Sequence, residues 1–404
     1  MKATLVSSLN VLKARLYVPA HLRVVFNDLF IYPRKSKNES LNHLQHVMGW
    51  LKCAQDVNQD GGVSAGYSFS RGWRPSYPET TGYIIPTFLD YYDFTKDGEE
   101  YLNRAIKIAD WLVSIQLESG AFQGGFIDAP PNPIVFNTGQ ALQGLIRITK
   151  ETSQDRYLKA AKRAADWLVE VQDDDGAWRR STYNGIPHVY HTRVAWPLLK
   201  LYKLTQDKSY LKAATNSVRW ALNNQEENGW FRNNAFDSRS YPFLHTIAYA
   251  IEGLLECAAL MKKGAWLEAA IKPAEVLLRR FEIRGSLSGI YDDKWKGTVS
   301  YRCLTGEAQI SVCWLKLFQL TGDARFLNVA LKMNDSLKKL QNTSSSNRGI
   351  NGGVKGSHPI WGDYQAFMYP NWAAKFFADA LILEERLLKH FQERYNDENE
   401  TTYT

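Results

Sequence analysis

Hydrophobic positions after about residue 40 recur at helical spacing, and they do so in units of two helices. The first helix of a unit has charges on one face and apolar side chains on the other, as in 101–112 (YLNRAIKIADWL) and 157–168 (YLKAAKRAADWL). The second helix is rich in Ala, Gly, Ile, Leu and aromatic residues and carries few charges, which is typical of a helix buried on more than one side. The pattern therefore predicts alternating outer and inner helices.

The unit repeats about every 55 residues. Outer helices end at a Gln that precedes a Gly-containing turn, at Gln116, Gln172 and Gln225, with an earlier copy at Gln55 and a weaker one at Gln341. Inner helices begin near a Thr, and the threonines are Thr81, Thr138, Thr192, Thr246 and Thr305, with a sixth inner helix over 369–382. Six helical pairs closed into a ring bury one continuous core. The prediction is an all-α chain, an (α/α)6 toroid of six inner and six outer helices over residues 39–388.

Positive charge is concentrated at the N-terminus. The 404 residues carry 49 Lys and Arg and 42 Asp and Glu, a net charge of +7, and residues 1–38 hold seven of the basic residues against Asp28 alone. Leu5, Leu9, Leu12 and Leu16 share one helical face in this basic amphipathic extension. The leucines either pack onto the main domain or meet an anionic membrane surface. The nearly neutral body argues against nucleic acid as a partner.

Composition and cysteine usage favour a cytoplasmic protein, and residues 1–38 leave open a peripheral contact with a membrane. The four cysteines form no CxxC pair, and neither a secretory signal nor an apolar run of membrane-spanning length is apparent. No spacing supports a zinc site, so we expect neither metal nor cofactor. Residues 389–404 are predicted to form a polar acidic tail.

Function is expected in the longer loops, which precede the inner helices and should open at one end of the ring. They combine Trp and Tyr with Arg, Asn, Asp and His. Aromatic rings stack on sugar rings, and guanidinium groups bind carboxylates through two hydrogen bonds, so the set favours an acidic saccharide. The candidate substrate-binding residues are Trp73, Arg74, Tyr77, Arg193, Arg302, His358, Trp361, Asp363 and Tyr364.

Two resemblances follow from these motifs. The Gln-x(3–4)-Gly-x-aromatic units, clearest in 164–178 (AADWLVEVQDDDGAW), resemble the QW motifs of squalene- and oxidosqualene-cyclase toroids, but the acid and metal-diphosphate motifs of those enzymes are missing from any buried context. The run 77–112 and its copies resemble the (α/α)6 catalytic domains of unsaturated-glucuronyl hydrolases, polysaccharide lyases and sugar epimerases, over roughly residues 40–385. The resemblance implies a carbohydrate-active toroid; it does not fix the reaction.

Three functions remain open from the sequence. His191 and His245 occupy equivalent places in successive repeats, so with Tyr190 or Tyr241 they could transfer protons in a lyase or epimerase acting on a uronate-containing glycan. A glycoside hydrolase would instead use a carboxylate pair drawn from Glu79, Glu307 and Asp363. The third possibility is a glycan-binding toroid without catalytic activity, in polysaccharide biosynthesis.

Overall fold

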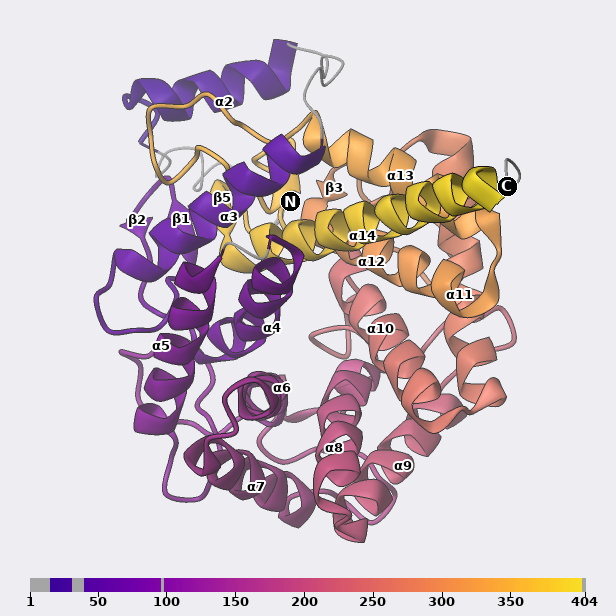
Figure 1. The fold of residues 1–404 in the computed structure, drawn as a ribbon. Helices are drawn as coiled ribbons and strands as arrows, with labels where there is room; N and C mark the ends of the chain where they lie inside the picture. Colours follow the sequence, from indigo (N-terminus) through magenta and orange to yellow (C-terminus); the bar gives the residue numbers. More distant parts are fainter. Residues whose placement is uncertain (1–14, 31–39, 96–97, 402–404) are drawn as a thin grey trace.

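The computed structural model describes residues 15–30, 40–95 and 98–401 and confirms the toroid. Figure 1 shows the helices arranged around a closed ring. The inner helices are α4 (Pro78–Thr95), α6 (Val135–Thr152), α8 (Thr192–Thr205), α10 (Leu244–Met261), α12 (Leu304–Thr321) and α14 (Asn371–Thr401). The outer helices are α3 (Ser40–Asp56), α5 (Glu99–Ile115), α7 (Asp155–Glu170), α9 (Lys208–Asn223), α11 (Gly264–Arg284) and α13 (Ala324–Lys338).

Packing between the two ends of the chain closes the ring. Each inner helix packs against the next one, and α14 packs back against α4. The first outer helix, α3, lies against the last inner helix, α14. Inner helix α10 is long and apolar enough to cross a membrane by composition, but 78% of it is buried within the protein, as an inner-ring position requires.

The repeated glutamines tie neighbouring outer helices together. Gln116 Nε2 donates to the carbonyl of Gly120 in its own turn at 2.8 Å and to that of Ala160 in the next outer helix at 2.9 Å. Gln172 and Gln225 make the same second bond at 2.9 and 2.8 Å. At the ring closure, Gln341 Nε2 donates to the His43 carbonyl of α3 at 3.2 Å. The QW-like motif is therefore a structural tie in this chain.

Short strands join the long loops at one end of the ring. The strands β2 (Gly72–Trp73), β1 (Gly66–Ser68) and β5 (Met368–Pro370) form an antiparallel sheet in that order, with Tyr67 opposite Tyr369. The strands β3 (Arg302–Cys303) and β4 (Ser357–His358) pair separately, also antiparallel. The first sheet links the loop before α4 to the loop before α14. The loops therefore join the two ends of the ring at the same place where α4 packs against α14.

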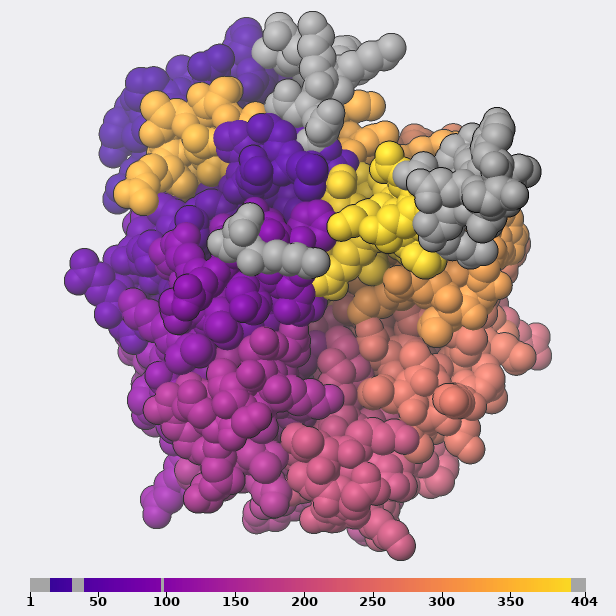
Figure 2. All heavy atoms as spheres, viewed as in Figure 1, coloured from indigo at the N-terminus to yellow at the C-terminus, as the bar shows by residue number. Residues whose placement is uncertain are grey.

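Helix α2 (Pro19–Phe30) packs on these loops at the edge of the molecule (Figures 1 and 2). The ring of His21 stacks on Phe69 with centroids 4.0 Å apart, and its Nε2 lies 3.0 Å from the Tyr67 hydroxyl. Of the predicted leucine stripe, Leu16 packs partly buried against the core, whereas Leu5, Leu9 and Leu12 lie outside the described residues. At the other terminus, α14 continues as helix to Thr401, through most of the range predicted as a tail.

Candidate active site

A cavity of about 310 Å³ opens among the N-terminal ends of the inner helices. Its volume is at the lower end of the range for small-ligand sites, about 300–1,000 Å³. Glu79, Asn137, His245 and Trp372 each stand within the first three residues of an inner helix, so the ring itself positions them. The lining residues are Tyr77, Glu79, Thr80, Tyr83, Gly124, Gly125, Ile134, Phe136, Asn137, Tyr183, Tyr190, Phe236, His245, Tyr249, Tyr364, Gln365 and Trp372.

Aromatic rings make most of the cavity wall. The hydroxyls of Tyr83 and Tyr249 lie 3.4 Å apart. Trp372 donates from its indole nitrogen to the Tyr364 hydroxyl at 2.9 Å, and its ring centroid lies 6.1 Å from that of Tyr77. Such flat faces and hydroxyls suit a sugar ring, whose axial hydrogens stack on aromatics while its hydroxyls form hydrogen bonds.

Glu79 supplies the only carboxyl group among the described residues that line the cavity. The apolar surroundings disfavour its charged form and raise its pKa to about 7, although a hydrogen bond from Tyr77 and the charge of Arg193 act in the opposite direction. Tyr77 is itself hydrogen-bonded to Asn137. A carboxyl group with a pKa near 7 can both give and accept a proton at neutral pH.

His245 lines the same cavity as a neutral imidazole. Burial lowers its pKa to about 3. Its Nδ1 lies 2.6 Å from Gln309 Oε1, which can only accept, so Nδ1 carries the proton and Nε2 is left with a free lone pair. In that tautomer His245 is a hydrogen-bond acceptor or weak base at Nε2.

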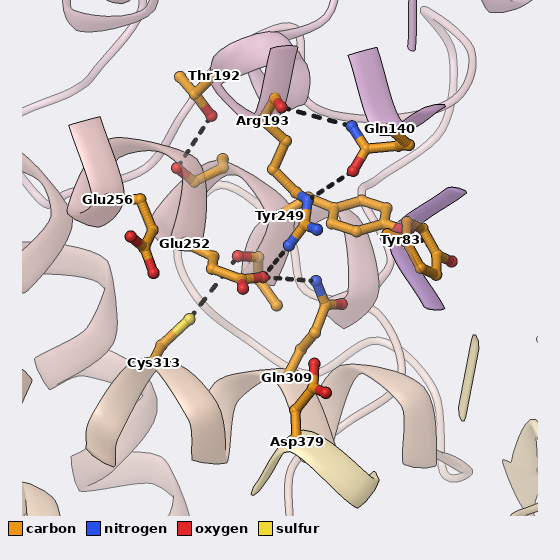
Figure 3. A network of polar contacts seen from close by, with 12 residues as sticks. Tyr83, Gln140, Thr192, Arg193, Tyr249, Glu252, Glu256, Gln309, Cys313 and Asp379 are labelled. Carbon is orange, nitrogen blue, oxygen red and sulfur yellow. Dashed lines mark hydrogen bonds and ion pairs between the residues drawn. The ribbon is translucent and has the colours of Figure 1, made fainter. Parts of the chain in front are cut away.

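A buried charge pair beneath the cavity holds this arrangement in place (Figure 3). Gln309 Nε2 donates to Glu252 at 3.4 Å, and Arg193 forms an ion pair with the same carboxylate. Burial raises the pKa of Glu252, but Arg193 and two nearby lysines outweigh that effect and lower it to about 2. Arg193 also donates from Nε to Gln140 Oε1 at 3.2 Å. The charged Glu252 orients the Gln309 amide, and the amide in turn sets the tautomer of His245.

Five residues predicted from the sequence come together in the cavity, and His191 is not among them. The lining includes Glu79, Tyr77, Tyr190, His245 and Tyr364. His191 is buried beside the ring of Trp178, 5.8 Å between centroids, and neither ring nitrogen has a hydrogen-bond partner. Burial lowers the pKa of His191 well below its usual range.

His191 and His245 are equally spaced along the repeats, but they differ in position relative to the start of the inner helix that follows or contains them. His191 ends the 3-10 turn η2 (Val189–His191) that precedes α8, whereas His245 is the second residue of α10. Because α8 begins later in its repeat, the two side chains leave the backbone from different local structures. The cavity consequently receives one histidine of the pair.

The predicted arginines are engaged elsewhere. Arg302 donates three hydrogen bonds to Glu307, the shortest at 2.6 Å, and Glu307 also accepts from the backbone N–H of Leu287 at 2.9 Å. This arrangement holds the loop before α12 and leaves neither group facing the cavity. Arg193 is held by Glu252, and Arg74 lies over the ring of Phe126 at 4.7 Å.

The remaining candidates support loops or face solvent. Trp73 packs against Trp50, with ring centroids 5.3 Å apart. His358 Nδ1 lies 3.1 Å from Lys355 Nζ and 3.3 Å from Asp28, so it belongs to the contact with α2. The candidates that pack partly buried or lie exposed outside the cavity lining are Trp361, Asp363 and Tyr241.

The sequence analysis predicted His245 but neither Tyr249, which lines the cavity, nor Glu252, which supports it from below. His245, Tyr249 and Glu252 follow one another at spacings of four and three, so they lie on one face of α10. The spacing could have indicated a buried polar site, because a Glu on the polar face of an otherwise apolar inner helix needs a buried partner.

Comparison with known proteins gives the same class of fold. The sequence model of the squalene-hopene cyclase C-terminal domain matches residues 74–262. The squalene–hopene cyclase of Zymomonas mobilis is 26% identical over 98 residues, which are 22% of this chain and 15% of that enzyme. The chain therefore spans only a small part of that curated relative.

Solved structures are similar over nearly the whole ring. An unsaturated glucuronyl hydrolase specific for heparin has a TM-score of 0.69 at 15% identity, covering 87% of this chain and 98% of that one. The unsaturated glucuronyl hydrolase of Bacillus sp. GL1 has a TM-score of 0.67 at 16% identity, with 86% and 97% covered. Cellobiose 2-epimerase from Bacillus thermoamylovorans B4167 scores 0.65 at 17% identity, with 85% and 98% covered. These likenesses establish the (α/α)6 toroid.

Proposed function

We propose that this protein is an enzyme that hydrolytically releases an unsaturated uronyl residue from an acidic oligosaccharide, with Glu79 as the proton-transfer group. The observation that carries the proposal is Glu79 itself, a carboxyl with a pKa of about 7 in an aromatic-lined cavity. The similarity in fold to unsaturated glucuronyl hydrolases supports the choice of substrate class.

A single carboxyl group favours addition of water over ordinary glycoside hydrolysis. Glycosidases that act on saturated sugars generally need two carboxyl groups, one on each side of the bond. Addition of water to a carbon–carbon double bond next to the ring oxygen needs one group. Glu79 would give its proton to one carbon, and its carboxylate would take a proton from the water that attacks the other. The hemiketal formed opens to a ketone, which leaves a hemiacetal at the anomeric carbon. This hemiacetal breaks down to an aldehyde and releases the neighbouring sugar as an alcohol, and Glu79 ends the cycle protonated.

Binding of the substrate carboxylate would rely on neutral donors. No Lys or Arg is among the described residues that line the cavity. Asn137, Gln365 and the tyrosine hydroxyls offer hydrogen-bond donors there. A cationic side chain in the lining would favour the charged form of Glu79 and lower its pKa, so the neutral lining leaves the raised pKa of Glu79 in place.

An absorbance assay tests the proposal. We expect incubation with unsaturated uronyl disaccharides to reduce the ultraviolet absorbance, because water addition destroys the double bond conjugated to the carboxylate. Intact uronate polymers serve as the control, since β-elimination on them would raise the absorbance instead. Binding without any change in absorbance of the disaccharides would contradict the proposal.

The pH dependence follows from the protonation state required. Since the reaction begins with proton donation from Glu79, kcat/KM should be constant well below pH 7 and should fall as pH rises through about 7. The measurement is a pH profile of kcat/KM on the disaccharide. A profile that rises through pH 7 would identify Glu79 as a base and would exclude this order of steps.

The two histidines should behave differently. We expect His245→Asn to reduce turnover by about tenfold to a hundredfold, because His245 lines the cavity and an amide lacks the basic nitrogen of the imidazole. His191→Asn should leave turnover unchanged, since His191 lies outside the lining. Single-variant kinetics, with thermal melting as the control for folding, make the comparison. Equal losses in both variants would restore the two-histidine mechanism.

Epimerisation is the second candidate function, and His245 is the observation that favours it. Its unprotonated Nε2 could remove a proton from a sugar carbon, as an epimerase requires, and the fold is also shared with cellobiose 2-epimerase. Exchange of a sugar C–H hydrogen with deuterated solvent, without bond cleavage, would distinguish this reaction from hydrolysis.

A further inference from the structure

Helix α2 exposes a continuous apolar face. Leu22, Phe26, Leu29 and Phe30 are between 52% and 67% exposed, and their spacing of four, three and one places them along one side of the helix. Tyr17, just before the helix, is 80% exposed. Five of the thirteen large hydrophobic side chains that are exposed among the described residues thus fall within 14 residues. Single exposed apolar residues are ordinary, but a cluster of this kind marks an interaction surface.

The opposite side of α2 is fixed to the protein. His21 and Val24 are buried, and Asp28 forms an ion pair with Lys355 and accepts from the backbone N–H of Ile360 at 2.7 Å. Figure 2 shows α2 on the outside of the molecule beside the orange segment of the loop before α14. The orientation of the helix is therefore set by buried contacts, and its apolar face remains turned outward.

The charge on and beside α2 indicates an anionic partner. Asp28, the only acidic residue among residues 1–38, has its side chain 6% exposed and faces Lys355. The described basic residues of this region, Arg15 and Arg23, are exposed. The outward side of α2 consequently combines an apolar stripe with positive charge and has no acidic side chain. That combination is complementary to the anionic surface of a bilayer, into which Phe and Leu insert while Arg binds headgroups.

We propose that α2 docks the protein on an anionic lipid bilayer. The docking face belongs to the same end of the ring as the cavity, because the loop before α14 contacts α2 through Ile360 and lines the cavity through Tyr364 and Gln365. Bilayer binding would hold the loop end of the toroid close to the surface. The inference depends only on α2 and its contacts and is independent of the reaction at Glu79.

Liposome flotation of the full chain tests the proposal. Vesicles of phosphatidylcholine with phosphatidylglycerol should bind the protein, less so as salt rises, and vesicles of phosphatidylcholine alone should bind it weakly. We expect Phe26→Ser/Leu29→Ser to weaken partitioning at least about tenfold, because two inserted side chains are removed. Arg15→Gln/Arg23→Gln should weaken binding and reduce its salt dependence.

The matched control is the double variant Leu204→Ser/Leu320→Ser. These two leucines are 40% and 45% exposed and lie near the C-terminal ends of α8 and α12, away from α2 in the sequence. It should float like the unmodified protein, and thermal melting should show both double variants folded. Equal flotation of the α2 variant, or absence of binding to the anionic vesicles, would overturn the proposal. So would a dimer, seen by light scattering, that the α2 substitutions dissociate, because a second copy would then cover this face.

Discussion

Replacing Glu79 with Gln should abolish most of the activity, by about a thousandfold, while leaving the fold intact. The amide keeps the size and hydrogen-bonding capacity of the protonated carboxyl but cannot donate a proton to carbon and recover one from water. Steady-state kinetics on an unsaturated uronyl disaccharide measure the loss. The magnitude is that of removing a general acid–base group, about 10²–10⁴-fold.

Stability supplies an independent readout of the same variant. The folded protein raises the pKa of Glu79 from 4.5 to about 7, so between these values the folded state binds the proton more tightly than the unfolded state. Stability therefore declines as pH rises from about 4.5 to 7, and Glu79→Gln should remove that part of the decline. Melting curves of both proteins at pH 5 and pH 8 make the comparison.

The control is Asp363→Asn, which neutralises an exposed carboxylate outside the cavity lining and should preserve turnover. An active Glu79→Gln protein would disprove the role of Glu79 whatever the substrate. A variant that loses activity together with its melting transition would instead show that Glu79 is needed for folding, contrary to the pH argument above.

The toroid could be predicted because similar local bonds recur in several of the units. Thr81 Oγ1 accepts from the backbone N–H of Val63 at 3.1 Å, and Thr138 accepts from Phe122 at 2.9 Å, so each threonine fixes a loop to the start of an inner helix. The repeated glutamines bind the next outer helix in the same way. Interactions that must recur leave a period in the sequence, and a period of helical pairs indicates a ring or a solenoid.

The site was less predictable, because its chemistry depends on pairings between different repeats. Arg193 has the features of a carboxylate clamp in the sequence, but its partner, Glu252, is 59 residues away on the neighbouring inner helix. Arg302 and Glu307 likewise form an ion pair with each other, so neither the predicted substrate-binding arginine nor the predicted catalytic carboxylate lines the cavity. Residue type and spacing cannot show which charges neutralise each other within the ring.

Breaking the Arg193–Glu252 pair should cause the largest loss of stability among these variants. Both side chains are buried, at 0% and 4% exposure, and the guanidinium also lies near the rings of Tyr249 and Phe376, 4.9 and 5.5 Å from their centroids. Removing one partner leaves the other charge buried without a compensating charge. We expect Glu252→Gln and Arg193→Met each to lower the free energy of unfolding by about 3–5 kcal/mol.

The double variant Arg193→Met/Glu252→Gln distinguishes pairing from mere packing. Because it removes both charges, it should be destabilised by clearly less than the sum of the single variants, with a coupling free energy of about 1–3 kcal/mol in urea denaturation. Lys159→Met provides the matched control. The side chains of Lys159 and Asp155, which form an ion pair at 2.7 Å, are 75% and 69% exposed, so this pair should contribute little to the free energy of unfolding. Strict additivity of the two buried substitutions would mean that Arg193 and Glu252 are stabilised separately. In that case Glu252 would not need Arg193 to remain charged, and the orientation of Gln309 and His245 would have to be fixed by other contacts.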